Sequence, residues 1–157
     1  MCNPPRHRLA TYIGNPRGSQ NEGEVKIAVH MAKRYILKGE KFKIITPYDA
    51  QRNAIEKALK NAGLPWESTV FNVDSFQGNE ADHIIVSIVR TSSPGFMKNK
   101  RRTNVMLSRC KKSMMILTNR GFLLKKNVAR TLVGKFASEH VTRTGWVTLQ
   151  DLALNQW

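Results

Sequence analysis

The sequence is poor in cysteine, in long apolar runs and in acidic residues. Its 157 residues hold two cysteines, Cys2 and Cys110, and neither belongs to a Cys-x-x-Cys pair or a Cys/His cluster. This argues against a disulfide framework and against structural zinc. No apolar run approaches the roughly 18 residues that cross a bilayer, and the first ten residues lack the apolar stretch of a signal peptide. We therefore expect an intracellular protein of the cytoplasm or nucleus, with no membrane partner.

The shortage of acidic residues is concentrated in one part of the chain. There are 26 Lys and Arg against 11 Asp and Glu, and the formal charge is +15. Residues 83–138 contain no Asp or Glu but half of the basic residues. Such a field attracts polyanions, and nucleic acid is the usual one. The alternative is a solvated basic face that aids solubility. The four histidines lie far apart without metal-ligand spacing, so we predict no metal site.

The apolar pattern predicts a single α/β domain with a mostly parallel sheet. The 41% hydrophobic content at this length suits one compact core. Helical spacing predicts helices over residues 22–38, 50–62, 101–111 and about 120–139. β-prone runs predict strands over residues 42–46, 69–73, 83–89 and 114–117, with weaker signals at 9–13 and in the TGWVTL segment. We divide the chain into an N-terminal edge or linker (1–20), the domain (21–140) and a C-terminal tail packing on it (141–157).

Polar residues cluster where the predicted strands end. In an open parallel sheet, ligands bind at the carboxyl ends of the strands, so we expect these residues to share that one edge. They are Thr46, Pro47, Tyr48, Gln51, Arg52, Asp74, Ser75, Gln77, Gly78, Glu80, Asp82, Arg90, Thr91 and the stretch from Asn104 to Arg109. Each has a structural alternative: Tyr48 suits a helix cap, Gln77 and Gly78 a turn, and Arg109 a surface ion pair. Together they are typical of a nucleotide or phosphate surface.

Three segments carry a family resemblance. ITPYDAQR (45–52), VFNVDSFQGNEADHIIVSIVRT (70–91) and RRTNVMLSRCKKSMMIL (101–117) resemble motifs IV, V and VI of superfamily 1 helicases of the nonsense-decay and senataxin-like type. Asn21 and Glu24 resemble the Asn and Glu that open the preceding helix in that family. The similarity covers residues 21–120. It implies the second RecA-like domain of the motor: a three-layer P-loop NTPase type of fold that lacks the P-loop itself.

The resemblance also implies roles for single residues. ATP and Mg²⁺ would be held by a companion P-loop RecA-like domain in cis, and this domain would supply cations for the γ-phosphate. Arg109 corresponds to the arginine finger and Arg52 to a second phosphate-facing cation. Tyr48 would stack on adenine, while Gln77, Gly78 and Glu80 would contact the ribose or phosphates. A single strand of RNA or DNA would meet Thr46, Pro47, Asp74, Ser75, Arg90, Thr91 and Ser92.

The chain departs from the family pattern in three respects, the mildest of which is Cys110 in place of a usual Ala. Lys111 stands where many relatives have a second Arg, which keeps the charge but loses the bidentate fork. No G-x-x-x-x-G-K-[ST] sequence and no Asp-Glu pair after an apolar strand occurs in these residues. We therefore expect no ATPase activity from this chain alone. Two alternatives remain: a non-catalytic basic module that binds nucleic acid, and a doubly wound nucleotide-binding enzyme, which the absence of G-x-G-x-x-G disfavours.

Overall fold

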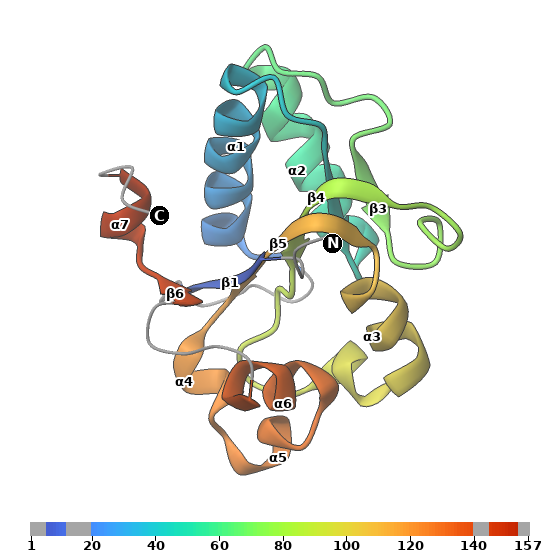
Figure 1. The fold of residues 1–157 in the computed structure, drawn as a ribbon, viewed down its shortest axis with the longest axis vertical. Helices are drawn as coiled ribbons and strands as arrows, with labels where there is room; N and C mark the ends of the chain where they lie inside the picture. Colours follow the sequence, from blue (N-terminus) through green and yellow to red (C-terminus); the bar gives the residue numbers. More distant parts are fainter. Residues whose placement is uncertain (1–5, 12–19, 140–144, 154–157) are drawn as a thin grey trace.

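Six parallel strands form one sheet in the order β3-β2-β4-β5-β1-β6 (Figure 1). The computed structural model describes residues 6–11, 20–139 and 145–153. The strands are β1 (Arg6–Thr11), β2 (Phe42–Thr46), β3 (Val70–Asn72), β4 (Ala81–Ser87), β5 (Cys110–Thr118) and β6 (Trp146–Val147). The central strand β4 pairs with β2 on one side and with β5 on the other. The predicted mostly parallel α/β sheet is confirmed.

Helices cover both faces of the sheet (Figure 1). One face carries α1 (Glu22–Leu37), α2 (Asp49–Asn61) and α7 (Leu149–Ala153). The other carries η1 (Gly95–Lys98), α3 (Lys100–Leu107), α4 (Arg120–Leu123), α5 (Lys126–Ala129) and α6 (Leu132–Glu139). The result is a three-layer domain with one apolar core on each side of the sheet.

The central strands are apolar because each of their faces is covered. In β4, Ile84 and Val86 pack in the core under α3, while Ile85 packs in the core under α1 and α2. All three are fully buried. Alternate residues of a strand point to opposite faces, so a strand covered on both faces has no polar side. Burial of each such side chain contributes about 1.5–3 kcal/mol.

The first two helices agree closely with the sequence. α1 begins after Asn21, whose side-chain oxygen accepts from the Glu24 N–H at 3.2 Å, and it ends before Gly39. α2 ends before Gly63. Both glycines have positive φ, 66° and 68°, which is the conformation that favours glycine after a helix. The predicted helices over 22–38 and 50–62 are confirmed to within one residue at each end.

Two predicted helices are wrong in extent. The helix expected over 101–111 ends at Leu107, because the Arg109 carbonyl accepts from the Ala81 N–H at 3.1 Å and the chain then enters β5. The helix expected over 120–139 is broken into α4, α5 and α6. Thr131 starts a new helix there, since its hydroxyl oxygen accepts from the Gly134 N–H at 3.1 Å.

The N-terminal segment belongs to the sheet. β1 lies between β5 and β6, and Leu9 and Ala10 are fully buried. Residues 6–11 are therefore part of the domain and not a linker that precedes it. The strand predicted near TGWVTL is confirmed as β6, whereas residues 12–13 and 140–144 lie outside the described residues. Within the described ranges, no helix has the length and apolarity needed to cross a bilayer.

Candidate functional site

The parallel sheet separates the predicted site residues into two groups. All strands run in one direction, so their carboxyl ends define one edge of the sheet, the carboxyl edge, and their starts define the opposite amino edge. Thr46 ends β2, and Tyr48 and Arg90 follow the ends of β2 and β4, whereas Glu80 and Arg109 precede the starts of β4 and β5. A seven-residue strand is about 20 Å long. The expectation that all these residues share one edge is therefore wrong.

At the amino edge, Glu80 and Arg109 lie just before the starts of two neighbouring strands. The backbone hydrogen bond from Ala81 N to Arg109 O joins the two strand starts. The half-exposed Arg109 donates from Nε to the Val105 carbonyl at 3.1 Å, which fixes the guanidinium at the end of α3. Lys111 Nζ lies 3.5 Å from the exposed Glu80 carboxylate. The edge thus offers a fixed guanidinium beside a carboxylate and a second cation.

Gln77 and Gly78 form an exposed turn that leads into β4. Gly78 has φ +85°, and a Cβ added to it would meet nothing within 4 Å, so the turn needs glycine for its backbone conformation and not for lack of room. Phe76 is buried against Phe71, with ring centroids 5.1 Å apart, and anchors the turn to the sheet. These two residues therefore lie in the turn that leads to Glu80 and the start of β4.

Tyr48 lies at the carboxyl edge, in contact with Arg90. The Arg90 guanidinium carbon is 5.3 Å from the centre of the Tyr48 ring, and the Tyr48 hydroxyl accepts from Phe96 N at 3.4 Å. A Cβ on Gly95 would come within 2.8 Å of both Tyr48 Oη and Arg90 Cδ. One face of the ring is already occupied, and Arg109 is on the other edge. The prediction that Tyr48 and Arg109 serve one nucleotide is wrong.

Arg52 is also displaced from the predicted nucleotide group. It lies in the first turn of α2, which begins at the carboxyl edge. Its Nε is 4.0 Å from a carboxylate oxygen of Asp49 and 4.0 Å from one of Glu56. Arg52 is therefore held between two acidic side chains of its own helix and does not join Arg109.

Three arginines along the carboxyl edge each lie against an aromatic ring. Besides Arg90 over Tyr48, the guanidinium carbon of Arg102 is 4.8 Å from the Phe96 centroid, and that of Arg120 is 5.4 Å from the Trp146 centroid. Such contacts are favourable electrostatically and restrict the side chain to one arrangement. The edge carries preformed cationic groups at the ends of several strands.

The other residues expected to contact a strand differ in accessibility. Thr46 and Pro47 are buried, so their side chains are not presented to a partner. Asp74 is exposed, but its carboxylate forms a two-point ion pair with Arg102, including a 2.8 Å bond to Arg102 Nε. Ser75 donates to the Asn72 carbonyl at 2.9 Å.

Solvent reaches the residues that follow β4. Arg90 and Thr91 are partly exposed, and Ser92 is exposed. Of the predicted strand-contacting set, Arg90, Thr91 and Ser92 are therefore the best placed. Thr46 and Pro47 are the worst placed, because burial removes their side chains from the surface.

A buried polar network lies beneath this edge. It comprises Asn21, Glu24, Gln51 and Ser87, which we call the clamp. The Glu24 carboxylate accepts from Ser87 Oγ at 2.5 Å and from Asn21 Nδ2 at 3.3 Å. Gln51 donates to Ser87 Oγ at 3.0 Å and accepts from the Asn21 N–H at 2.8 Å. The clamp joins the starts of α1 and α2 to the end of β4.

The clamp also binds a strained residue, Val89. Val89 has φ +71°, and Arg90 N donates to Ile88 O at 2.9 Å, which closes a γ-turn. This form of the γ-turn is rare, and positive φ is exceptional for a β-branched residue. Strain of this kind costs about 1–3 kcal/mol and persists where the surroundings enforce it. Here the Glu24 carboxylate accepts from Val89 N at 2.9 Å.

Burial changes the acidity of Glu24. The side chain is 1% exposed, and desolvation raises its pKa from 4.5 to about 7, against the opposing effect of the hydrogen bonds from Ser87 and Val89. Two features of the sequence point to this network: the Asn-x-x-Glu spacing that opens α1, and a serine inside an otherwise apolar strand. Neither signal indicates that Glu24 reaches across to β4, because a capping box would direct it to the Asn21 N–H, which Gln51 occupies.

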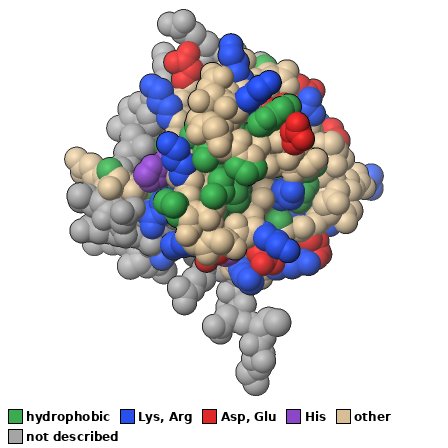
Figure 2. All heavy atoms as spheres, turned by 90° about the horizontal axis from the view of Figure 1, so that it is seen from above, with side chains coloured by type: hydrophobic (Ala, Val, Ile, Leu, Met, Phe, Trp, Pro, Cys, Tyr) green, Lys and Arg blue, Asp and Glu red, His purple; other side chains and the backbone are tan. Residues whose placement is uncertain are grey.

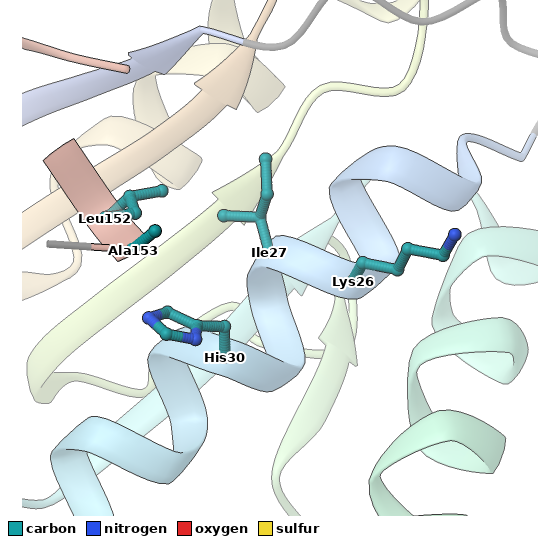
Figure 3. Close-up of a pocket in the computed structure, with 5 residues that line it drawn as sticks. All are labelled: Lys26, Ile27, His30, Leu152 and Ala153. Carbon is teal, nitrogen blue, oxygen red and sulfur yellow. The ribbon is translucent and has the colours of Figure 1, made fainter. Parts of the chain in front are cut away.

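Two other surfaces lie apart from these edges. A shallow hollow of about 170 Å³ between α1 and α7 is lined mainly by apolar atoms of Lys26, Ile27, His30, Leu152 and Ala153 (Figure 3). No predicted site residue lines it. On the face shown in Figure 2, basic and acidic side chains are interspersed around several hydrophobic ones. No group of three or more His, Cys, Asp or Glu in the described residues is arranged to hold a metal.

Comparisons with known proteins place the chain in a family. A family model described as an AAA domain matches residues 8–121. An uncharacterised ATP-dependent helicase of Methanocaldococcus jannaschii is 36% identical over 90 residues, which is 57% of this chain and 13% of that protein. Regulator of nonsense transcripts 1 of Dictyostelium discoideum is 37% identical over 110 residues, or 65% of this chain and 8% of that protein. The chain thus spans a small part of the length of these relatives.

A solved structure shows the same fold. The C-terminal domain of a possible DNA helicase from Lactobacillus plantarum WCFS1 superposes with a TM-score of 0.51 at 18% identity, covering 92% of this chain and 84% of that one. The fold is RecA-like, with a parallel sheet between two helical layers. Family match, relatives and fold agree, and the chain belongs to the AAA-domain family as a superfamily 1 helicase domain of the nonsense-decay type.

Proposed function

We propose that this chain is the second motor domain of an ATP-dependent RNA or DNA helicase. Its amino edge would face a nucleotide held by a companion P-loop domain, and its carboxyl edge would bind a single strand. The names of the relatives, an ATP-dependent helicase and a regulator of nonsense transcripts, support the general activity. The separation of Arg109 from Arg90 by the length of β4 supports two distinct binding surfaces.

The row of ring-supported arginines at the carboxyl edge is the observation that carries this proposal. Arg102, Arg90 and Arg120 are each held against an aromatic ring. A guanidinium already restricted in this way loses less side-chain entropy when it binds a phosphate. Contacts to the phosphates carry no base information, which suits an enzyme that must move along any sequence.

The amino edge fits a supporting role at a nucleotide site. Arg109 uses Nε to bind the Val105 carbonyl, which does not engage its two terminal nitrogens, and a planar guanidinium can bind two phosphate oxygens. Glu80 and the Gln77–Gly78 turn lie alongside for contact with the ribose or phosphates. ATP supplies the phosphoryl group to be transferred, and Mg²⁺ neutralises its charge. The described residues offer no cluster for Mg²⁺, so the companion domain would hold the metal.

Binding of a labelled single-stranded oligonucleotide to the 157-residue chain tests the carboxyl edge. Affinity should fall steeply between about 50 and 200 mM salt, and Arg90→Ala should lower the slope of log K against log salt by about 0.7, the contribution of one phosphate contact. Lys60→Ala is the matched control, because Lys60 also lies over a ring, Trp66 at 5.1 Å, but at the far end of α2. Equal losses in both variants would refute a defined interface.

Reconstitution with the companion P-loop domain tests the amino edge. Arg109→Ala should reduce strand-stimulated ATP hydrolysis by about 10³-fold or more, the range typical of arginine fingers. Arg130→Ala, which removes an exposed arginine after α5, should leave the rate unchanged. A non-catalytic binding module would instead bind the strand indifferently to ATP, and hydrolysis would not depend on Arg109.

A further inference from the structure

The chain turns sharply just before the arginine nearest the centre of the carboxyl edge. β4 ends at Ser87, and the γ-turn at Val89 redirects the backbone at Arg90. Val89 is fully buried and has φ +71°. A relaxed valine would not adopt this conformation, so the direction in which Arg90 leaves the sheet depends on whatever holds Val89.

Both peptide groups of Val89 are held by the clamp. Its N–H donates to Glu24 Oε2 at 2.9 Å, and its carbonyl accepts from Asn21 Nδ2 at 3.2 Å. Glu24 is fixed in turn by Ser87 Oγ at 2.5 Å, and Gln51 ties Ser87 to the Asn21 carbonyl. The partner of the Val89 N–H, the Glu24 carboxylate, is therefore itself bound to β4 through Ser87. The γ-turn cannot relax without breaking the hydrogen bond from Val89 N to Glu24.

The side chain of Arg90 is confined as well as its backbone. The Tyr48 ring lies on one side of the guanidinium, and Gly95 packs so closely that a Cβ there would be 2.8 Å from Arg90 Cδ. The position of Arg90 is thus set by two independent constraints: the clamp acts on the backbone, and Tyr48 with Gly95 acts on the side chain.

We infer that Glu24 is a positioning residue for strand binding: its carboxylate holds the Val89 γ-turn and thereby fixes Arg90 at the carboxyl edge. The inference rests on the proposed function and assigns Glu24 no contact with the strand. By charge alone, a carboxylate beneath an anion-binding edge would repel phosphate. A positional role accounts for a buried acid in a place where its charge opposes binding.

Two substitutions distinguish a positional role of Glu24 from an effect of its charge. Glu24→Ala removes the acceptor for Val89 N–H, whereas Glu24→Gln removes the same charge but keeps an amide oxygen for Val89 and Ser87. With single-stranded oligonucleotide as the probe, Glu24→Ala should bind about tenfold more weakly, the equivalent of one hydrogen bond to a charged group, and lose about 0.7 of the salt slope, as Arg90→Ala does. Glu24→Gln should stay within about twofold of the original chain.

The double variant Glu24→Ala/Arg90→Ala should bind no more weakly than Arg90→Ala alone, because both changes remove one contact. Additive losses, an undiminished affinity in Glu24→Ala, or an equal loss in Glu24→Gln would each overturn the inference. If Glu24→Ala does not fold, Asn21→Ser takes its place: it keeps a helix-capping oxygen and removes the amide donor to the Val89 carbonyl.

The NMR signal of the Arg90 Nε–H group reports the position of the Arg90 side chain without any nucleic acid. The Tyr48 ring should shift this signal in the original chain and in Glu24→Gln, and the shift should vanish in Glu24→Ala. An unchanged signal in Glu24→Ala would overturn the inference. If Arg90→Ala leaves oligonucleotide binding intact while the shift is lost in Glu24→Ala, the clamp acts as described and the proposed strand contact of Arg90 fails.

Discussion

Replacing Glu24 by glutamine should remove a pH dependence from the folding stability of this domain. The carboxylate is 1% exposed, and in the described residues its oxygens meet three neutral donors: Ser87 Oγ, Val89 N and Asn21 Nδ2. Among the residues that the structure describes, no cation compensates for the desolvation of the charge, and burial raises the pKa to about 7. Glutamine has the same shape, carries no charge at any pH and keeps an acceptor for two of the donors.

The sign and size of the effect follow from the two pKa values. The folded state binds the Glu24 proton more tightly than the unfolded state, where the ordinary pKa is 4.5. The stability that protonated Glu24 contributes is therefore complete below about pH 4.5 and is lost as the pH rises through about 7. At about 1.4 kcal/mol for each pH unit between these values, the loss is about 3 kcal/mol. This is a large share of the 5–15 kcal/mol typical of a domain.

Urea unfolding followed by circular dichroism between about pH 5 and 8 measures this directly. The quantity of interest is the unfolding free energy of the original chain minus that of Glu24→Gln at each pH, because all other titrating groups cancel. Glu22→Gln is the matched control: Glu22 is exposed, lies in the same helical turn and carries the same charge. A difference that stays flat, or that rises with pH, would show that the hydrogen bonds to the carboxylate outweigh its desolvation.

Three further substitutions test how the chain is packed. Gly95→Ala should weaken oligonucleotide binding and lower stability by about 1–3 kcal/mol, because the new Cβ meets Arg90 Cδ at 2.8 Å, as urea and binding titrations would report. Gly134→Ala should lower the unfolding free energy by at least about 2 kcal/mol, since its Cβ would lie 2.2 Å from the Val128 carbonyl oxygen. Thr46→Val should leave oligonucleotide binding unchanged and raise stability by about 1 kcal/mol, because the buried Thr46 hydroxyl has no hydrogen-bond partner among the described residues.

Controls for these substitutions come from the same chain. Gly121→Ala is the control for Gly134→Ala, because a Cβ on Gly121 would approach only the Asn119 side chain, at 3.3 Å. If Gly121→Ala lowered the unfolding free energy by a comparable amount, packing against the Val128 carbonyl would not be the cause of the loss in Gly134→Ala. For Thr46→Val, weaker oligonucleotide binding would mean that the Thr46 hydroxyl becomes accessible to the strand. Unaltered binding in Gly95→Ala would contradict the close packing of Arg90.

Local patterns in the sequence identify most of the fold. The apolar run His83–Val89 predicts a central strand, and β4 is indeed paired on both sides and covered on both faces. Periodic apolar positions and a following glycine fix α1 and α2. The predictions fail where a segment could either continue a helix or pair with a strand. Arg109 fits the preceding helical pattern, but its carbonyl accepts a hydrogen bond from Ala81 N in the neighbouring strand. The residues around Arg109 in the sequence do not indicate this long-range bond.

The predicted arrangement of the site residues along one edge of the sheet is wrong. Because Glu80 follows β3 in the chain, the sequence pattern predicts it at the carboxyl edge, but a loop that leaves the end of one parallel strand must return to the start of the next. Glu80 is the residue before β4, so it lies at the end of this loop, at the amino edge. The clamp is harder to foresee, since Glu24 lies 63 residues from Ser87 and 65 from Val89 in sequence. Only the folded sheet brings these groups together.

The two edges are joined by elements that span the whole sheet. β4 begins next to Glu80 at one edge and ends before the turn that precedes Arg90 at the other. α3 begins two residues before Arg102, which is bound to Asp74, and ends two residues before Arg109. β4 is hydrogen-bonded to strands on both sides, and its core residues are fully buried, so it has little freedom to bend or slide. In the proposed motor, a rotation of this domain that brings Arg109 to the nucleotide therefore carries Arg90 by a fixed amount along the strand. The clamp contributes to this coupling, because with a flexible γ-turn at Val89 the sheet could move without moving Arg90 by the same amount.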